Sequence, residues 1–505
     1  MQRLGWIRVC AAVLASVAIL AALWRLEGGK ADLAISELVI GTSPATLYTP
    51  AAGPSGPAVV IAHGFAGSRQ LMEPFAVTLA RAGYSALAFD FRGHGRNPVP
   101  LTGDITREDG ASRTLLAELD RMVGYAAALP GARGRAALLG HSMASDIVVR
   151  QAVADPRVPA TIAVSMFSRA VTADAPKNLL IIVGGWENFL SQEALKAVAL
   201  SAGEAEEAVT YGAFADGSAR RAVFADNVEH VGVLYSAESL VEAVTWLDGV
   251  FDREGSSPAP DVRGPWVLLL IGGIVAMAWP LARLLPRTVE PPVGAGLGWR
   301  GLLVLAGIPA LATPLILKFL PTEFLPVLVA DYLAAHFALY GVLTALGILI
   351  IRRGPSIWRG MDAVLLAAAA VALWAVGALG WALDSYVASF WPHGGRITVI
   401  GALLAGILPF MLADEWLTRG AGARRGAYAI TKLCLLASLA LAVALDLERL
   451  FFLIIIFPVI LLFFLLYGLI SGWVMRATGQ PAVAALANSL AFAWALGVTF
   501  PLVAG

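Results

Sequence analysis

Nine long apolar runs constrain the fold of this chain more than any other feature of its sequence. They cover residues 6–24, 265–285, 301–320, 325–351, 362–383, 397–415, 427–446, 450–474 and 481–504. Each run is close to the length, about twenty residues, that a helix needs to cross the hydrocarbon core of a bilayer. Hydrophobic residues make up 58% of the chain and charged residues only 14%, which is unlike a typical soluble domain. We therefore predict a polytopic, all-α transmembrane domain.

Nearly all of the charge lies in one region, from about residue 30 to residue 263, which also carries alternating strand and helix patterns. A Gly, Ser and Pro-rich stretch at 255–260 favours an exposed connection after this region. The predicted division is an N-terminal transmembrane anchor or signal-like helix at 1–29, an α/β domain at 30–254, a linker at 255–264, and a transmembrane domain of about eight helices at 265–505.

Basic residues occur in alternate loops between the apolar runs. The Arg-rich segments contain Arg3 and Arg8; Arg283, Arg287 and Arg300; Arg352, Arg353 and Arg359; Arg419, Arg424 and Arg425; and Arg476. By the positive-inside rule these segments are cytoplasmic. We therefore expect a multi-pass protein of a bacterial-type cytoplasmic membrane, with the α/β domain extracytoplasmic.

The first apolar run fits either a retained anchor or a cleaved signal peptide. We favour the anchor, because no clear small-x-small cleavage site precedes Trp24 and Arg25. Both interpretations place the α/β domain on the same side of the membrane.

Composition and motifs exclude several classes of function. The 36 basic and 36 acidic residues balance, so no polybasic signal for nucleic acid exists. Cys10 and Cys434 lie far apart in apolar runs, which argues against a disulfide framework or a cysteine metal site. The sequence has no HExxH, Walker or dinucleotide-binding motif, so we expect neither a metal nor another cofactor.

A serine lies at a predicted strand-to-helix turn. The segment Gly140-His141-Ser142-Met143-Ala144-Ser145 follows the apolar run 135–139 and precedes a helical pattern at 146–150. A serine between small residues in such a turn has its hydroxyl exposed above the sheet. We therefore predict Ser142 as a catalytic nucleophile.

Several segments together resemble the core motifs of the α/β-hydrolase superfamily, nearest to its esterase, lipase and serine-aminopeptidase-like branches. They are AHGFAGS, AFDFRGHGRN, GHSMAS, VGGWEN and VEHVGVLY, and they span residues 57–251. The resemblance implies an α/β-hydrolase domain, a mainly parallel sheet flanked by helices, joined here to the all-α transmembrane domain. The membrane half resembles no family that we can name.

A nucleophilic serine needs a base and an acid that holds the base in the right tautomer. His230 lies late in the domain, where the superfamily places its base. Glu187 follows the predicted strand 179–183 and matches the acid position, with Asp216 as the alternative acid. The order Ser142, Glu187, His230 is the order of the superfamily.

The resemblance also implies two backbone N–H donors for the oxyanion, those of Phe65 and Met143. Supporting residues in the same two loops are His63, Gly64, Gly140 and His141. We expect His94 and Arg92 to stabilise a turn below the site. The connection 166–179 is too short for a lid, so the domain is predicted to lack one.

These features predict a membrane-embedded serine hydrolase that forms an acyl-enzyme. Its expected substrate is a small-molecule or lipid-like acyl ester or thioester, with membrane lipids as the surroundings and no protein partner specified. One alternative is a serine peptidase with the same triad. Another is a transporter or scaffold with an outward hydrolase-like binding domain, although a complete set of triad candidates argues against it.

Ionisable residues within apolar runs are candidates for function, because burying charge in a membrane is costly. Asp331, His336 and Lys432 are such residues. The structural alternatives are an interhelical hydrogen bond for His336 and a Lys432 side chain that extends to the interface. We favour structural roles over transport.

Overall fold

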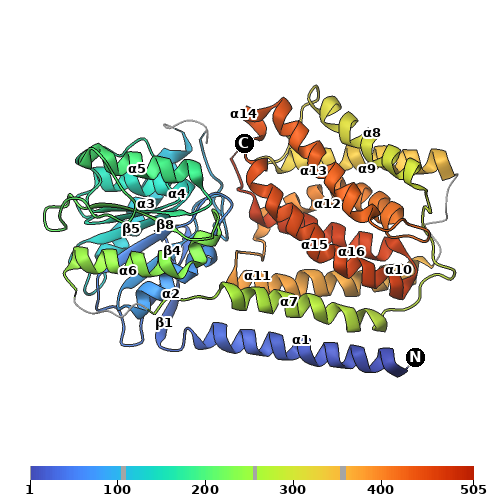
Figure 1. The fold of residues 1–505 in the computed structure, drawn as a ribbon, viewed down its shortest axis with the longest axis horizontal. Helices are drawn as coiled ribbons and strands as arrows, with labels where there is room; N and C mark the ends of the chain where they lie inside the picture. Colours follow the sequence, from blue (N-terminus) through green and yellow to red (C-terminus); the bar gives the residue numbers. More distant parts are fainter. Residues whose placement is uncertain (1, 104–109, 254–258, 353–359, 505) are drawn as a thin grey trace. The chain divides into compact units, whose positions relative to one another are not determined.

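The computed structural model describes residues 2–103, 110–253, 259–352 and 360–504. The chain divides into two compact units (Figure 1). The α/β unit comprises Ala22–Leu268, Asp384–Ser389 and Pro501–Gly505. The helical unit comprises Met1–Ala21, Leu269–Leu383 and Phe390–Phe500. Residues 255–258 of the predicted linker lie outside the described residues, as do Arg353 and Arg359.

The α/β unit differs from the predicted domain at 30–254, because two later segments also belong to it. One is Asp384–Ser389, which the sequence places between two apolar runs, and the other is Pro501–Gly505. Both are more than one hundred residues beyond the predicted end of the domain. Segments from the membrane half of the sequence are therefore built into this unit.

Eight strands form one sheet in the α/β unit. They are β1 (Leu33–Ile40), β2 (Ser43–Pro50), β3 (Ala58–Ala62), β4 (Ser85–Phe89), β5 (Ala136–His141), β6 (Thr161–Val164), β7 (Leu179–Gly184) and β8 (Arg220–Ala225). Their order is β1-β2-β4-β3-β5-β6-β7-β8, with β2 antiparallel to β1 and β4 and all other pairs parallel. The loops after the parallel strands therefore meet at one edge of the sheet, where α/β proteins place their sites.

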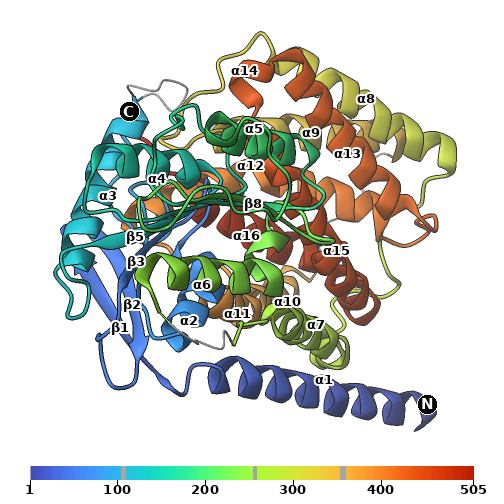
Figure 2. The same cartoon turned by 60° about the vertical axis from the view of Figure 1, so that its left-hand side comes forward.

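Helices cover both faces of this sheet (Figures 1 and 2). One layer contains α2 (Glu73–Arg81) and α6 (Ala237–Phe251), and the other contains α3 (Ala111–Ala127), α4 (Met143–Ala154) and α5 (Asn188–Ala202). Side chains alternate along β3, so that Val59 and Ile61 pack against the α2 and α6 layer while Val60 faces α3 and α4. Burial on both faces explains why the central strands are continuous apolar runs. Short 3₁₀ turns, η1 (Arg69–Met72) and η2 (Gly232–Tyr235), complete the unit.

The remaining helices carry most of the apolar sequence. They are α1 (Gln2–Gly28), α7 (Gly264–Leu281), η3 (Ala282–Leu284), α8 (Trp299–Leu317), α9 (Ala330–Arg352), α10 (Met361–Ala372), η4 (Leu373–Ala378), α11 (Leu379–Tyr386), α12 (Gly394–Thr418), α13 (Ala427–Leu445), α14 (Leu447–Leu450), α15 (Leu453–Thr478) and α16 (Pro481–Thr499). Within the described residues, nine helical stretches are long and apolar enough to cross a membrane. One of them, Met361–Tyr386, joins α10, η4 and α11. The fold is thus compatible with a multi-pass membrane protein.

Small residues allow a close contact between α9 and α12 in the helical unit. A Cβ atom on Gly341 of α9 would lie 2.2 Å from the backbone nitrogen of Phe410 in α12. A Cβ atom on Gly406 of α12 would lie 2.4 Å from the carbonyl oxygen of Ala334. The missing side chains let α9 and α12 pack backbone to backbone, which is how helices commonly associate in lipid.

Candidate active site

Ser142 occupies the sharp turn between β5 and α4. Its backbone angles, φ 55° and ψ −117°, lie in a region that non-glycine residues rarely adopt, so the turn stores strain. A Cβ atom on Gly140 would lie 2.5 Å from the carbonyl oxygen of Ala144, so this position requires glycine. Ala144 is fully buried, which explains the need for a small side chain there. The turn leaves the Ser142 side chain half-buried at the carboxyl edge of the sheet.

His230 follows β8 and contacts Ser142. Its Nε2 atom lies 2.8 Å from the Oγ atom of Ser142. Its Nδ1 atom lies 2.5 Å from the Oε1 atom of Glu187. The His230 side chain is 38% exposed, whereas that of Glu187 is 9% exposed. This geometry lets the imidazole take the serine proton while the carboxylate fixes the imidazole tautomer.

Glu187 follows β7 and is held by three hydrogen bonds. Besides the contact with His230, its Oε2 atom accepts from the Ser165 hydroxyl at 2.6 Å and from the Gly184 N–H at 2.9 Å. Burial by itself raises the pKa of this carboxyl, but the hydrogen bonds from His230, Ser165 and Gly184 outweigh burial and lower the pKa below its ordinary value. Glu187 is therefore ionised near neutral pH.

Asp216, the alternative acid, lies elsewhere. It is fully exposed in the turn before β8 and accepts hydrogen bonds from the backbone N–H and the hydroxyl of Ser218, at 2.9 and 2.5 Å. Of the two carboxylates weighed from the sequence, the structure brings Glu187 to His230.

The predicted oxyanion donors lie in two neighbouring segments. Met143 is the first residue of α4, so its N–H lies at the positive end of the helix dipole. Phe65 follows Gly64, and a Cβ atom on Gly64 would lie 3.0 Å from the Cβ atom of Ser142. The absence of a side chain at Gly64 thus allows the loop that carries Phe65 to approach the serine.

Two further histidines hold the loops of the site. His63 donates from Nδ1 to the Gly64 carbonyl at 2.8 Å and accepts at Nε2 from the Phe91 N–H at 3.1 Å, and burial lowers its pKa. His141 contacts the carbonyl oxygen of His230 through Nε2 at 2.9 Å, and burial lowers its pKa to about 3. Both rings are therefore neutral, and their contacts are structural.

Arg92 and His94 contact the turn after β4. The Nδ1 atom of His94 lies 3.0 Å from the carbonyl oxygen of Arg92, and the Arg92 N–H donates to the buried Glu118 at 2.8 Å. These contacts agree with the predicted role of the two residues in stabilising this turn.

Sequence reasoning missed Ser165. This residue follows β6 with φ 50°, and its hydroxyl orients the Oε2 atom of Glu187. No motif marks it, because a single serine after a short strand is common. Its place one residue beyond a parallel strand is the only signal that could have drawn attention to it.

The two distant segments of the α/β unit contact loops next to the candidate site. The Ser389 N–H donates to the Ser68 hydroxyl at 3.1 Å, in the loop that begins with His63. Asp384 forms an ion pair with Arg96. The Leu502 N–H donates to the Gly93 carbonyl at 2.9 Å, and the Leu502 carbonyl accepts from Leu101 at 2.8 Å. These contacts brace the loops after β3 and β4.

The ionisable residues singled out in the apolar runs all have local partners. Asp331 accepts from the backbone N–H groups of Phe324 and Tyr332, at 3.0 and 2.8 Å. His336 contacts the Ser438 hydroxyl on α13 at 3.0 Å. Asp331 thus contacts its own helix and the segment before it, and His336 contacts a second helix, as the structural interpretation expects.

Lys432 differs from the structural alternative suggested by the sequence. Its side chain does not extend to an interface, because it forms a buried ion pair with Asp414 of α12, both side chains being at most 6% exposed. The neighbouring Glu415 accepts from the Ser471 hydroxyl at 2.5 Å. Buried polar side chains in this unit thus join α12 to α13 and α15.

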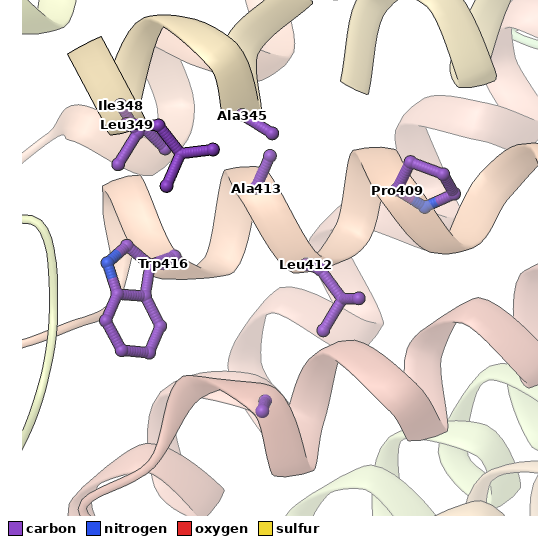
Figure 3. A pocket seen from close by; sticks show the side chains of 8 residues that line it. Ala345, Ile348, Leu349, Pro409, Leu412, Ala413 and Trp416 are labelled. Atoms are coloured by element: carbon purple, nitrogen blue, oxygen red, sulfur yellow. The ribbon is translucent and has the colours of Figure 1, made fainter. Parts of the chain in front are cut away.

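A pocket of about 190 Å³ lies within the helical unit between α9, α12 and α16 (Figure 3). It is lined by Ala345, Ile348, Leu349, Pro409, Leu412, Ala413, Trp416 and Ala482. These side chains are apolar except for the indole nitrogen of Trp416. The pocket can hold hydrocarbon, but its wall offers no nucleophile, acid or base. In the described residues, no group of three or more His, Cys, Asp or Glu side chains is placed to hold a metal ion.

Comparisons with known proteins identify the superfamily that part of this chain resembles. A family model described as serine aminopeptidase, S33, matches residues 53–215. Residues 53–215 therefore match the α/β-hydrolase superfamily in sequence. The α/β unit also has the fold of that superfamily, a mostly parallel sheet flanked by helices.

Individual relatives match only part of this chain. Two uncharacterised proteins from strains of Mycobacterium tuberculosis are each 35% identical over 104 residues, which is 21% of this chain and 34% of theirs. The chain thus spans about one third of the length of the curated relatives it matches. An epoxide hydrolase from Vigna radiata is similar at 18% identity over 27% of this chain and 39% of that chain, with a TM-score of 0.22. A thioesterase domain from the curacin biosynthetic pathway is similar at 27% identity over 26% of this chain and 44% of that chain, with a TM-score of 0.21.

Proposed function

We propose that this protein is a membrane-embedded serine hydrolase that cleaves an ester, thioester or lipid-like acyl substrate. The observation that carries the proposal is the hydrogen-bonded series Ser142, His230 and Glu187, with distances of 2.8 and 2.5 Å. The strained turn at Ser142 adds weight, because strain of this kind gathers at functional sites.

In the proposed mechanism the Oγ atom of Ser142 attacks the acyl carbon and its proton passes to Nε2 of His230. The backbone N–H groups of Met143 and Phe65 stabilise the oxyanion of the tetrahedral intermediate. Collapse of the intermediate breaks the bond to the leaving alcohol or thiol, which takes the proton from His230. Water, deprotonated by His230, then attacks the acyl-enzyme and releases the acid and free Ser142.

The proposed reaction takes place at the outer face of a bacterial-type cytoplasmic membrane. Support comes from the alternation of Arg-rich and Arg-poor loops along the sequence. A reporter fused at residue 256 should then read as extracytoplasmic, and one in the loop 352–359 as cytoplasmic. The opposite pattern would overturn the orientation while leaving the chemistry untouched.

Fluorophosphonate labelling of the full-length protein tests the chemistry, because this reagent forms a bond only with an activated serine. We expect labelling of the wild type, and loss of both labelling and ester hydrolysis in Ser142→Ala. Ser145→Ala is the matched control, since Ser145 is the neighbouring serine and its hydroxyl donates to the Ser142 carbonyl. Labelling that survives in Ser142→Ala would place the nucleophile elsewhere.

A serine peptidase is the second candidate, favoured by the description of the matching family model. The two activities share the same triad and differ in the leaving group. Turnover of p-nitrophenyl esters, acyl thioesters and aminoacyl p-nitroanilides should therefore be compared under the same conditions. We expect kcat/KM to be highest for the esters or thioesters, and preference for the anilides would favour the peptidase.

A further inference from the structure

A polar pocket of about 490 Å³ lies in the α/β unit. Ser142 is not among the residues that line it. It is lined by Trp24, Arg25, Leu26, Gly28, Gly29, Arg81, Pro260, Asp261, Val262, Arg263 and Trp266. These residues come from the end of α1, the end of α2, and the segment that leads into α7. The pocket thus forms where one long apolar helix ends and another begins.

Two arginines in this pocket have no carboxylate partner among the described residues. The guanidinium of Arg25 lies 5.1 Å from the ring centre of Trp266 and 5.8 Å from that of Trp24. Arg81 donates only to backbone carbonyls, those of Gly29 at 2.5 Å and Ala259 at 3.2 Å. Both guanidinium groups therefore keep their full charge and further N–H donors for an anion.

The third arginine of the pocket is already neutralised. Arg263 is buried and forms ion pairs with both Asp261 and Glu73. Lys30 also contacts Glu73 at 2.8 Å, so no free acidic group of this cluster compensates the other two arginines. The pocket therefore carries a net positive charge from Arg25 and Arg81.

We propose that this pocket binds a phosphate group, held between the guanidinium groups of Arg25 and Arg81. Guanidinium matches phosphate geometrically, because its planar N–H donors bind two phosphate oxygens at once. Two sources supply this chemistry, a phospholipid headgroup and free phosphate.

The tryptophans favour the phospholipid headgroup. Trp24 lies in the last turns of α1 and Trp266 in the first turn of α7, both helices being apolar and long enough to span a bilayer. Tryptophan concentrates at the level of lipid headgroups. Trp24 is 72% exposed, which is costly in water but not at a membrane surface. The pocket thus lies at the depth where lipid phosphates are found.

The full-length protein, freed of lipid in a non-ionic detergent, provides the test. It is incubated with dioleoyl phosphatidylglycerol, dioleoyl phosphatidylcholine or dioleoylglycerol, and bound lipid is counted by native mass spectrometry. We expect both phospholipids to be retained and the phosphate-free dioleoylglycerol to be lost. Equal retention of dioleoylglycerol would overturn the proposal.

Arginine variants locate the binding. Arg25→Gln with Arg81→Gln should weaken retention about tenfold or more, since charge-assisted hydrogen bonds are lost. Arg135→Gln, at an exposed arginine outside the pocket, is the matched control and should bind as the wild type does. Unchanged retention in the double variant would overturn the proposal.

Arg81 also donates hydrogen bonds to two backbone carbonyls, so its replacement can prevent folding. Single variants at Arg25 test the proposal if the double variant does not fold. Arg25→Gln should lose retention and Arg25→Lys should keep part of it, with the midpoint of thermal unfolding unchanged in both. Equal retention in Arg25→Gln and the wild type would count against the site.

Inorganic phosphate separates the two sources. Retention of phosphatidylglycerol in the presence of excess phosphate supports the headgroup. Displacement of the lipid by phosphate supports a phosphate site whose ligand is soluble phosphate. This displacement should not occur in the double variant. Neither result depends on Ser142, because binding rather than turnover is measured.

Discussion

The two units of this protein each contain a histidine in contact with a serine, and the two contacts are nearly the same length. In the α/β unit, Nε2 of His230 lies 2.8 Å from the Ser142 hydroxyl. In the helical unit, Nε2 of His336 lies 3.0 Å from the Ser438 hydroxyl. The hydrogen bond alone therefore does not distinguish a candidate catalyst from a contact between helices.

The surroundings of the two histidines differ. The second ring nitrogen of His230 contacts the Glu187 carboxylate at 2.5 Å, whereas that of His336 contacts only the Tyr332 hydroxyl at 3.5 Å. His230 is partly exposed, and His336 is fully buried. The α/β unit thus adds a carboxylate partner for the histidine and an exposed histidine side chain.

The largest expected effect comes from removing each histidine in turn. His230→Gln should lower ester turnover by roughly 10⁴- to 10⁶-fold, because the serine loses its base. His336→Gln should leave turnover close to that of the wild type. Steady-state kinetics on a short-chain ester measures both, and similar losses in the two variants would erase the distinction between the units.

Glu187 tests which property of the α/β unit matters most. Glu187→Gln should lower kcat by about 10⁴-fold, because the amide holds the imidazole in the wrong tautomer and cannot stabilise its cation. Asp216→Asn is the matched control at an exposed carboxylate and should leave kcat unchanged. If Asp216→Asn were the damaging change, the geometry around His230 would not be the working one.

His141 sharpens the comparison, because it lies beside the site yet is buried like His336. Burial lowers its pKa to about 3, from an ordinary value of 6.5. Between these two values the unfolded chain binds a proton that the folded chain does not. The contribution of His141 to the free energy of unfolding is therefore constant above pH 6.5 and falls by about 1.4 kcal/mol for each pH unit between pH 6.5 and about pH 3.

Thermal unfolding midpoints measured between pH 7 and pH 5 test this dependence, in a range above the ordinary pKa of carboxyl groups. His141→Gln should flatten the curve by the share that His141 contributes. Part of the dependence on pH should remain in this variant, because burial also lowers the pKa of His63. An unchanged slope in His141→Gln would show that the ring is protonated in the folded protein.

Ser165 supports Glu187 without contacting His230 in any described hydrogen bond. Ser165→Ala removes one of the donors to the Glu187 carboxylate. We expect kcat to fall about tenfold, which corresponds to one hydrogen bond to a charged group, with little change in KM. Ser165→Thr, which keeps the hydroxyl, should restore part of the rate. A loss confined to KM would point to substrate binding instead.

The smallest effect is expected at Ser68. Ser68→Ala removes the acceptor for the Ser389 N–H and should loosen the loop that carries Phe65. A few-fold decrease in kcat is expected, comparable to one neutral hydrogen bond of about 1 kcal/mol. Ser55→Ala, at a serine in a different loop, provides the control. If Ser68→Ala had no effect, residues 384–389 would not help to position this loop.

Much of the fold could be predicted from local sequence patterns. The strand predicted at 179–183 is β7, Leu179–Gly184, because a fully buried parallel strand is a short apolar run. The nine apolar runs correspond to nine helical stretches among the described residues, since span length is fixed by the bilayer. The turn at Ser142 could be predicted from the sequence, because its geometry requires small neighbouring residues.

Contacts between distant residues could not be predicted in this way. The antiparallel strands β1 and β2 precede residue 57, where the segments that resemble the superfamily begin. The pairing of Lys432 with Asp414 depends on how two helices face each other, which the apolar pattern of either helix does not specify. The same holds for Ser165 and Glu187, which lie 22 residues apart and meet only once the sheet has formed.

The pairing of Leu502 with Gly93 and Leu101 has a consequence for the order of events on the ribosome. About 400 residues separate these partners, which at ~5–20 residues per second corresponds to roughly 20–80 s of synthesis. During that interval the nascent α/β unit has its strands and its serine turn, but the turn after β4 lacks its contacts with Leu502. The α/β unit is therefore completed in two stages, and its early form is the species that chaperones and proteases meet first.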